Sequence, residues 1–291
     1  MHPDIEDLRV RVTQRRYHPW ALTTFLGASV AVAGRTATRH PALVRSWRRR
    51  ALYRALLLPL VARLLGCSPR SRILWLTYLW QQSDVYLHLG LNRRPDARAV
   101  RMSFTLPTEC TLLRAYAAAA LASGCKRPRR ALVCGVITDI LDGYLARRLR
   151  RQTALGALLD SEYDAYLALA ALAAIRRHGR RENALEQAIA LRFGGQFLTG
   201  LAGFFIRSHT TAVGSTRAGK VSGTVQALAL YRALGSAESR YQTGRLMRVA
   251  LRATAVGAVV AQGLRYTRPR AAAPTDAPTD TATDASARAD T

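Results

Sequence analysis

The sequence of 291 residues predicts an all-α protein, and two observations support that prediction. Ala and Leu, which favour helices, are abundant along the chain, whereas the alternation of apolar and polar residues that is typical of strands is rare. Long apolar stretches also recur, and Arg-rich or Gly/Ser-rich segments separate them. The stretches lie at residues 22–26, 51–66, 73–91, 111–124, 131–146, 155–175, 184–206, 221–234 and 246–265.

Hydropathy alone does not decide whether these helices cross a membrane. A membrane-spanning helix needs roughly 20 mostly apolar residues, and the longest uncharged runs are shorter. They have 17 residues from His18 to Gly34, 14 from Phe193 to Ile206 and 12 from Ala253 to Leu264. The sequence is therefore compatible with a soluble all-α domain, or with a membrane bundle whose polar residues face inward and whose many small residues allow close helix packing.

The charge of the chain indicates an anionic partner. Lys and Arg number 44 against 18 Asp and Glu, which gives a formal net charge of +26, and only Lys126 and Lys220 are lysines. Nucleic acid, anionic lipid or a phosphorylated substrate would each fit this charge. Charge by itself does not choose among them.

The four cysteines are predicted to be reduced residues of the core. They are scattered along the chain at Cys67, Cys110, Cys125 and Cys134. No two of them form a C-x-x-C motif, and none clusters with His at the spacing of a zinc site.

Four aspartates stand in the apolar segment DILDGYLARRLRRQTALGALLDSEYD, residues 139–164. Asp139 and Asp142 are three residues apart and share a helix face, and Asp160 and Asp164 are four apart and share another. Gly156 lies one turn before Asp160 on the same face. Two helices joined by a turn can therefore direct all four carboxylates at one point.

Four carboxylates at an apolar point require a counter-charge if they are to ionise together. Their hard oxygens are suited to Mg²⁺ or Mn²⁺, and two such ions about 3.5–4 Å apart would neutralise a phosphoryl group during transfer. The alternative is a pair of ordinary solvated helix faces, which the apolar surroundings of Asp160 and Asp164 argue against.

The arrangement of these residues resembles the signature of the CDP-alcohol phosphatidyltransferases. That signature is D-x-x-D-G-x-x-A-R, eight residues, then G-x-x-x-D-x-x-x-D. All of its positions and spacings occur here, at Asp139, Asp142, Gly143, Ala146, Arg147, Gly156, Asp160 and Asp164.

Two further segments resemble the same family. LPTECTLLRAY at 106–116 is similar to the P-N-x-L-T-x-x-R opening of the first core helix, although Thr108 and Cys110 depart from the usual Asn and Leu. AGKVSGTVQ at 218–226 is similar to the fifth helix of phosphatidylglycerophosphate and cardiolipin synthases, with Gly223 where Lys is common.

The resemblance covers roughly residues 104–266 and implies an all-α, polytopic membrane bundle of about six core transmembrane helices. The implied spans are 111–124, 131–147, 155–175, 186–206, 221–235 and 246–265. We expect a basic helical extension over residues 1–103, the membrane domain over 104–270 and a disordered tail over 271–291. The extension holds all four Trp and is rich in Arg, so it is either a segment on an anionic membrane surface or a helical cap packed on the domain.

The resemblance also implies roles for individual residues. Asp139, Asp142, Asp160 and Asp164 would bind two ions of Mg²⁺ or Mn²⁺, and Asp164 is the position of the catalytic base. The residues expected to bind the CDP group are Thr111, Gly143, Ala146, Arg147 and Gly156. Arg114 and Lys220 are the candidates for holding an acceptor phosphate, and contact with lipid headgroups is the alternative for both.

The implied reaction transfers a phosphatidyl group from a CDP-linked lipid, such as CDP-diacylglycerol, to an alcohol and releases CMP. The segment around Lys220 favours glycerol 3-phosphate as the acceptor; phosphatidylglycerol comes second, and inositol phosphate or serine are left open. The family further implies a homodimer, multi-pass in the cell membrane, with its active site facing the cytoplasm. Nucleic acid is not an expected partner.

Two other classes of protein are weaker interpretations. A prenyl-diphosphate transferase also uses Asp and Mg²⁺, but its two Asp-rich motifs lie on distant helices, whereas both pairs here fall within residues 139–164. A non-catalytic basic helical protein that binds anionic lipid or nucleic acid would explain the charge of +26 but not the four aspartates.

Overall fold

The computed structural model describes residues 19–94, 100–179, 181–205, 216–235 and 244–267, together with residues 10, 12 and 14. Within these ranges the chain forms helices and no strand, which confirms the all-α prediction. The helices are α2 (Pro19–Arg39), α3 (Pro41–Leu64), α4 (Arg72–Leu87), η1 (Leu89–Leu91), α5 (Leu106–Ala122), α6 (Pro128–Arg148), α7 (Ala154–Arg177), α8 (Asn183–Ile189), η2 (Ala190–Gly194), α9 (Gly195–Phe205), α10 (Arg217–Ala233) and α11 (Arg245–Thr267). The predicted tail at 271–291 lies outside the described residues.

Local sequence sets several of the helix ends. Pro41, Pro107 and Pro128 occupy the first turns of α3, α5 and α6, where proline's missing N–H costs no hydrogen bond. Gly66 and Gly124 follow α3 and α5 with φ of 76° and 74°, a left-handed conformation that ends a helix and favours glycine.

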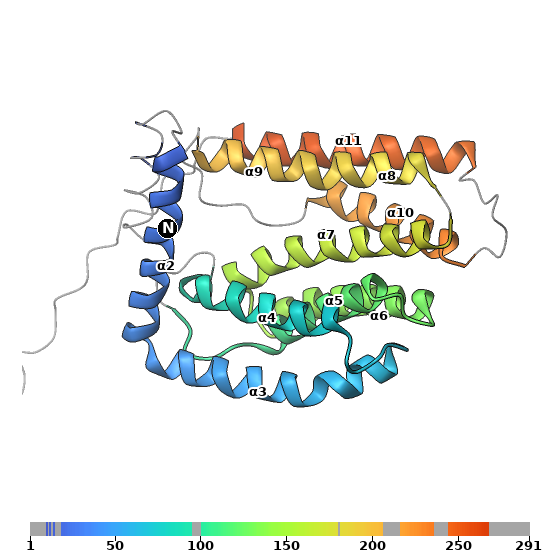
Figure 1. The fold of residues 1–291 in the computed structure, drawn as a ribbon. Coiled ribbons are helices and arrows are strands. Elements are labelled where there is room, and N and C mark those ends of the chain that lie inside the picture. Colours follow the sequence, from blue (N-terminus) through green and yellow to red (C-terminus); the bar gives the residue numbers. More distant parts are fainter. Residues whose placement is uncertain are drawn as a thin grey trace, which may run out of the picture.

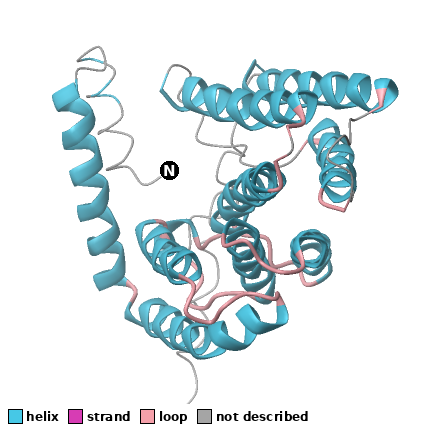
Figure 2. Cartoon of the chain, turned by 45° about the vertical axis from the view of Figure 1, so that its right-hand side comes forward, coloured by secondary structure: helices cyan, strands magenta, loops and turns pink. Residues whose placement is uncertain are grey.

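The helices form a bundle in which the axes of most helices are roughly parallel or antiparallel (Figure 1). At its centre α5 packs closely against α6 and α7, while α8, α9 and α11 lie together on one side and α3 and α4 on the other. Helix α2 runs across one end of the bundle, as Figures 1 and 2 both show.

The N-terminal helices share a hydrophobic core with the helices that follow residue 104. Leu58 and Leu74 pack with Tyr116 of α5 in one buried cluster. In a second cluster Val85 packs with residues of α5 and α7, among them Leu112. Helices α3 and α4 therefore pack against the helices that follow residue 104.

All six predicted core segments are helical, but they are not all single regular helices. The segment predicted at 186–206 consists of α8, the π-helical segment η2 and α9 in succession. Over the described part of the chain, no helix is both long enough and apolar enough to qualify as a membrane crossing.

Candidate active site

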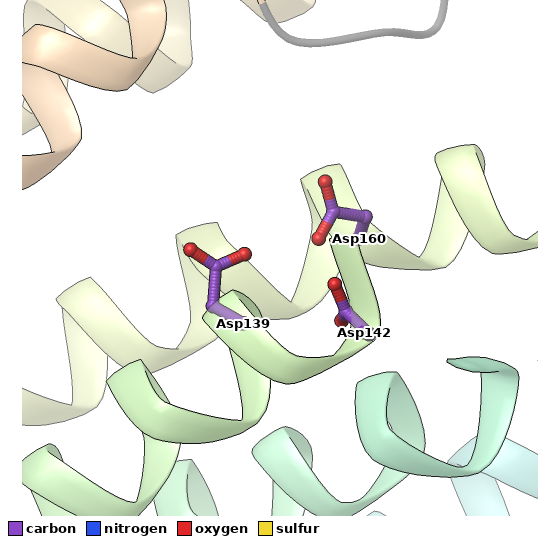
Figure 3. A group of neighbouring side chains, drawn as sticks. All are labelled: Asp139, Asp142 and Asp160. Atoms are coloured by element: carbon purple, nitrogen blue, oxygen red, sulfur yellow. The ribbon is translucent and has the colours of Figure 1, made fainter. Parts of the chain in front are cut away.

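The signature aspartates meet where α6 and α7 face each other. Asp139 and Asp142 come from α6 and Asp160 from α7, and Figure 3 shows their carboxyl groups directed toward one region. One carboxylate oxygen of each lies within 4.8 Å of one from each of the others. The helical spacing of the sequence therefore produces the convergence that it predicted.

Arg114 of α5 pairs with all four aspartates, although it is itself fully buried. Its Nη2 lies 2.9 Å from Asp139 and also bonds Asp142, and its Nη1 lies 2.6 Å from both Asp160 and Asp164. One guanidinium thus serves four carboxylates, and most of their negative charge is left to be balanced by something else.

Thr111 extends this arrangement one turn before Arg114. Its hydroxyl lies 2.9 Å from Oδ2 of Asp142 and can donate a hydrogen bond to it. Because Thr111 and Arg114 share a face of α5, this helix contacts the carboxylates through both side chains.

A cavity of about 700 Å³ lies over the carboxylates. Every site residue predicted from the sequence lines it except Arg114, which is covered by its carboxylate partners. The predicted residues on the wall are Thr111, Asp139, Asp142, Gly143, Ala146, Arg147, Gly156, Asp160, Asp164 and Lys220.

Two helices begin at this cavity with the same local structure. In α7 the hydroxyl of Thr153 accepts a hydrogen bond from the backbone N–H of Gly156, and in α10 Thr216 accepts one from Gly219. A Cβ on either glycine would lie 3.1 Å from the capping hydroxyl, so glycine leaves room for the cap. Helix N-termini carry partial positive charge and favour anions.

Gly143 makes space for a charged group at the cavity wall. A Cβ on Gly143 would lie 3.2 Å from Nη1 of Arg147, which is one turn further along α6. The guanidinium of Arg147 therefore lies against this glycine.

Arg192 is a cation of this cavity that the sequence interpretation missed. It lies on the π-helical segment η2, is 8 % exposed, and donates a hydrogen bond from Nη1 to Oε1 of Gln226 at 3.0 Å. A Cβ on Gly223 would lie 3.2 Å from the same nitrogen. The position of Arg192 inside an apolar segment could have indicated a functional residue, because charged residues in such segments usually mark function. The π-helical turn that orients its side chain could not be predicted from the sequence. π-Helical turns occur frequently at functional sites.

Comparison with known proteins agrees with this geometry. The family model described as CDP-alcohol phosphatidyltransferase matches residues 104–261, which is more than half of the chain. No curated protein and no solved structure gives a significant match. The matched residues contain the carboxylates and all of the residues that line the cavity. The chain belongs to the CDP-alcohol phosphatidyltransferase family, whose enzymes transfer a phosphatidyl group from a CDP-alcohol in phospholipid synthesis.

Proposed function

We propose that this enzyme transfers a phosphatidyl group from CDP-diacylglycerol, or a similar CDP-linked lipid, to glycerol 3-phosphate. The observation that supports this choice is that the cavity over the four carboxylates is also lined by Lys220 of α10 and Arg192 of η2. Cations of this kind bind the phosphate of a phosphorylated acceptor. The next acceptor is phosphatidylglycerol, which would yield cardiolipin, followed by inositol phosphate and serine.

The carboxylates fit divalent cations in donor type and in charge. Their oxygens are hard ligands, three of them are close together, and the single charge of Arg114 balances only one of the four. Asp139, Asp142 and Asp160 would hold two ions of Mg²⁺ or Mn²⁺, with Asp164 beside the second. When bound, the ions would neutralise negative charge on the diphosphate of the donor.

Asp164 is the residue we assign as the general base. Its side chain is 27 % exposed and lines the cavity, so an acceptor bound there can reach it. It takes the proton of the acceptor hydroxyl as that oxygen forms a bond to the β-phosphorus of the donor. The bond between the β-phosphorus and the oxygen of CMP breaks, and CMP leaves.

The wall around the start of α7 is the site we assign to the CDP group. Gly143, Ala146 and Gly156 present little side-chain bulk there, and Arg147 and Thr111 supply a cation and a hydroxyl. Small side chains allow a nucleotide to approach the backbone closely, and the capped N-terminus of α7 favours its phosphates.

The acceptor side of the cavity lies between α10 and η2. Lys220 is in the first turns of α10, and both Lys220 and Arg192 are close enough to Asp139 to interact with it electrostatically. Arg192 also places positive charge beside Gly223 of α10. A phosphate held by these groups would leave an attached hydroxyl near the carboxylates.

The reaction and its acceptor are tested by CMP release from the purified enzyme in detergent. With CDP-diacylglycerol and Mg²⁺ or Mn²⁺ present, glycerol 3-phosphate is expected to support CMP release more strongly than phosphatidylglycerol, inositol phosphate or serine. Lys220→Ala is expected to raise the KM for glycerol 3-phosphate roughly 10- to 160-fold, because a hydrogen bond to a charged group is worth about 1.5–3 kcal/mol. The KM for the donor should not change.

Lys126→Ala is the matched control, since Lys126 is the only other lysine and lies in the turn after α5, away from the cavity. Preference for another acceptor would contradict the assignment of glycerol 3-phosphate. A rise in the KM for CDP-diacylglycerol in Lys220→Ala would instead move this residue to the donor site.

We also propose that the bundle lies in the cell membrane, as a homodimer with its active site facing the cytoplasm. The outer faces of α3 and α4 support the membrane assignment, because large apolar side chains are exposed on both. These side chains are Leu52, Tyr53, Leu56, Leu57, Leu60 and Leu64 on α3, and Ile73, Trp75, Leu76, Leu79, Trp80 and Leu87 on α4. An apolar surface of this extent indicates contact with lipid or with another protein.

The membrane assignment predicts how the expressed protein fractionates. It should sediment with membranes after washing with high salt and with alkaline carbonate, and should dissolve only in detergent. Release by high salt alone would show that the arginines bind the membrane surface electrostatically and that the apolar faces are not embedded.

A further inference from the structure

Two turns of the same local structure lie against each other at one end of the bundle. The sequence Ala-x-x-x-Gly-Cys occurs at the C-terminal end of both α3 and α5. Gly66 and Cys67 follow α3, and Gly124 and Cys125 follow α5. In both, the cysteine N–H bonds the alanine carbonyl and the glycine has positive φ. The two turns are joined by a backbone hydrogen bond from Lys126 to the carbonyl of Gly66, 3.1 Å long.

This contact brings the two cysteine side chains together. Sγ of Cys67 lies 3.6 Å from the carbonyl oxygen of Ala120, and the backbone N–H of Cys125 donates to the same oxygen at 3.1 Å. The thiols of Cys67 and Cys125 are also close enough to interact directly with each other. Cys67 belongs to the N-terminal helices and Cys125 to the residues matched by the family model, so the pair bridges two parts of the chain.

The surroundings of Cys125 favour its thiolate. The hydrogen bond from Cys67 lowers the pKa of Cys125, burial opposes this, and the backbone N–H of Arg127 and the charge of Arg177 lower it further, to about 7. Arg177 is held nearby because its Nη1 donates to the carbonyl of Ala122 at 2.9 Å. A thiolate is the nucleophile in thiol–disulfide exchange.

The two turns that carry the pair lie at the surface, although Cys125 itself is largely buried and Cys67 is half-buried. Ser68, Gly124, Lys126 and Arg127, which flank the two cysteines, are exposed. The turns lie at the start of α6, whereas the active-site cavity reaches the turn at its other end, through Thr153. With the active site facing the cytoplasm, the cysteines would face outward, where disulfides persist; the contact between them does not depend on that orientation.

We propose that Cys67 and Cys125 are a redox-reactive pair that forms a disulfide between the N-terminal helices and the catalytic domain. The oxidant is a small-molecule disulfide. The thiolate of Cys125 attacks one of its sulfurs, forms a mixed disulfide and releases one thiolate. Cys67 loses its proton and attacks the sulfur of Cys125, the mixed disulfide breaks, and the second small thiol leaves. Two protein thiols are oxidised and one disulfide is reduced to two thiols.

The test is peptide mapping of the full-length protein in detergent after incubation with oxidised glutathione. Free thiols are blocked with N-ethylmaleimide and the protein is digested with trypsin without reduction. We expect the peptide of residues 64–70 joined to that of residues 115–126, with Cys110 and Cys134 blocked by the reagent. The joined species should disappear on reduction.

Single variants show whether the pair stabilises the fold. Oxidised wild-type protein is expected to melt at a higher temperature than reduced protein, because the disulfide restricts the unfolded chain. Cys67→Ser and Cys125→Ser should lose this rise, and Cys134→Ser should keep it. The proposal is overturned if Cys67 and Cys125 are both blocked by N-ethylmaleimide after oxidation, or if each carries its own glutathione. Because the peptide map uses wild-type protein, this holds even if a variant fails to fold.

Discussion

Replacing Arg114 by Met is expected to destabilise the metal-free protein more than any other single change at the site. The substitution removes the fully buried cation that pairs with all four carboxylates and leaves their negative charges facing each other. Removing one partner of a buried ion pair costs about 3–5 kcal/mol. Thermal unfolding in the presence of a chelator measures the loss as a large fall in Tm.

Divalent cations should then restore much of the stability of Arg114→Met. A ligand present at 100 times its Kd stabilises the folded state by about 2.7 kcal/mol, and the carboxylates of the variant lack a competing guanidinium. The rise in Tm with Mg²⁺ or Mn²⁺ should therefore be larger in Arg114→Met than in the wild type. If neither Mg²⁺ nor Mn²⁺ raises the Tm of Arg114→Met, the carboxylates are not a cation site.

Two other variants separate the charge of Arg114 from its shape. Arg114→Lys keeps the charge but loses the planar fork that reaches four carboxylates, so its Tm should lie between those of the wild type and Arg114→Met. Arg176→Met removes an arginine from an exposed ion pair with Glu186 and should change Tm little. If Arg176→Met lowers Tm as much as Arg114→Met does, the burial of Arg114 does not explain the loss of stability.

Replacing Asp164 by Asn is expected to reduce CMP release about 10²- to 10⁴-fold, the usual contribution of general-base catalysis. Asn has nearly the same size but cannot take the proton of the acceptor hydroxyl. Because Asp164 is not among the three aspartates whose oxygens lie within 4.8 Å of each other, Asp164→Asn should keep most of the rise in Tm caused by Mg²⁺. The measurement combines the rate of CMP release with Tm at several Mg²⁺ concentrations.

Asp139→Asn and Glu186→Gln are the comparisons for this prediction. Asp139→Asn removes one of the three clustered carboxylates and should lose both activity and the response of Tm to Mg²⁺. Glu186→Gln changes a carboxylate that pairs with exposed Arg176 and should alter neither. Asp164→Asn releasing CMP at the wild-type rate would place the base on another residue.

The helices around the site could largely be predicted from local sequence, although their limits and one irregularity could not. Pro107, Pro128 and Gly124 mark helix ends through the backbone of their own residues, because proline fixes φ at a first turn and glycine permits the positive φ that follows a helix. The π-helical segment inside the predicted helix at 186–206 carries no comparable residue signal, since its register depends on how Arg192 packs against Gly223 and Gln226.

The sequence by itself determined the chemistry of the site, because spacings of three and four residues place Asp139 with Asp142 and Asp160 with Asp164 on helix faces whatever lies around them. Nearly all of the site residues that it predicted also lie on the cavity wall. Only the tertiary structure decided which cations meet those carboxylates: Arg114 arrives from α5 and is buried beneath them, and Arg192 arrives from η2. The contact between Cys67 and Cys125 was decided in the same way. Such contacts depend on how helices distant in sequence pack together, and no short-range spacing encodes that packing.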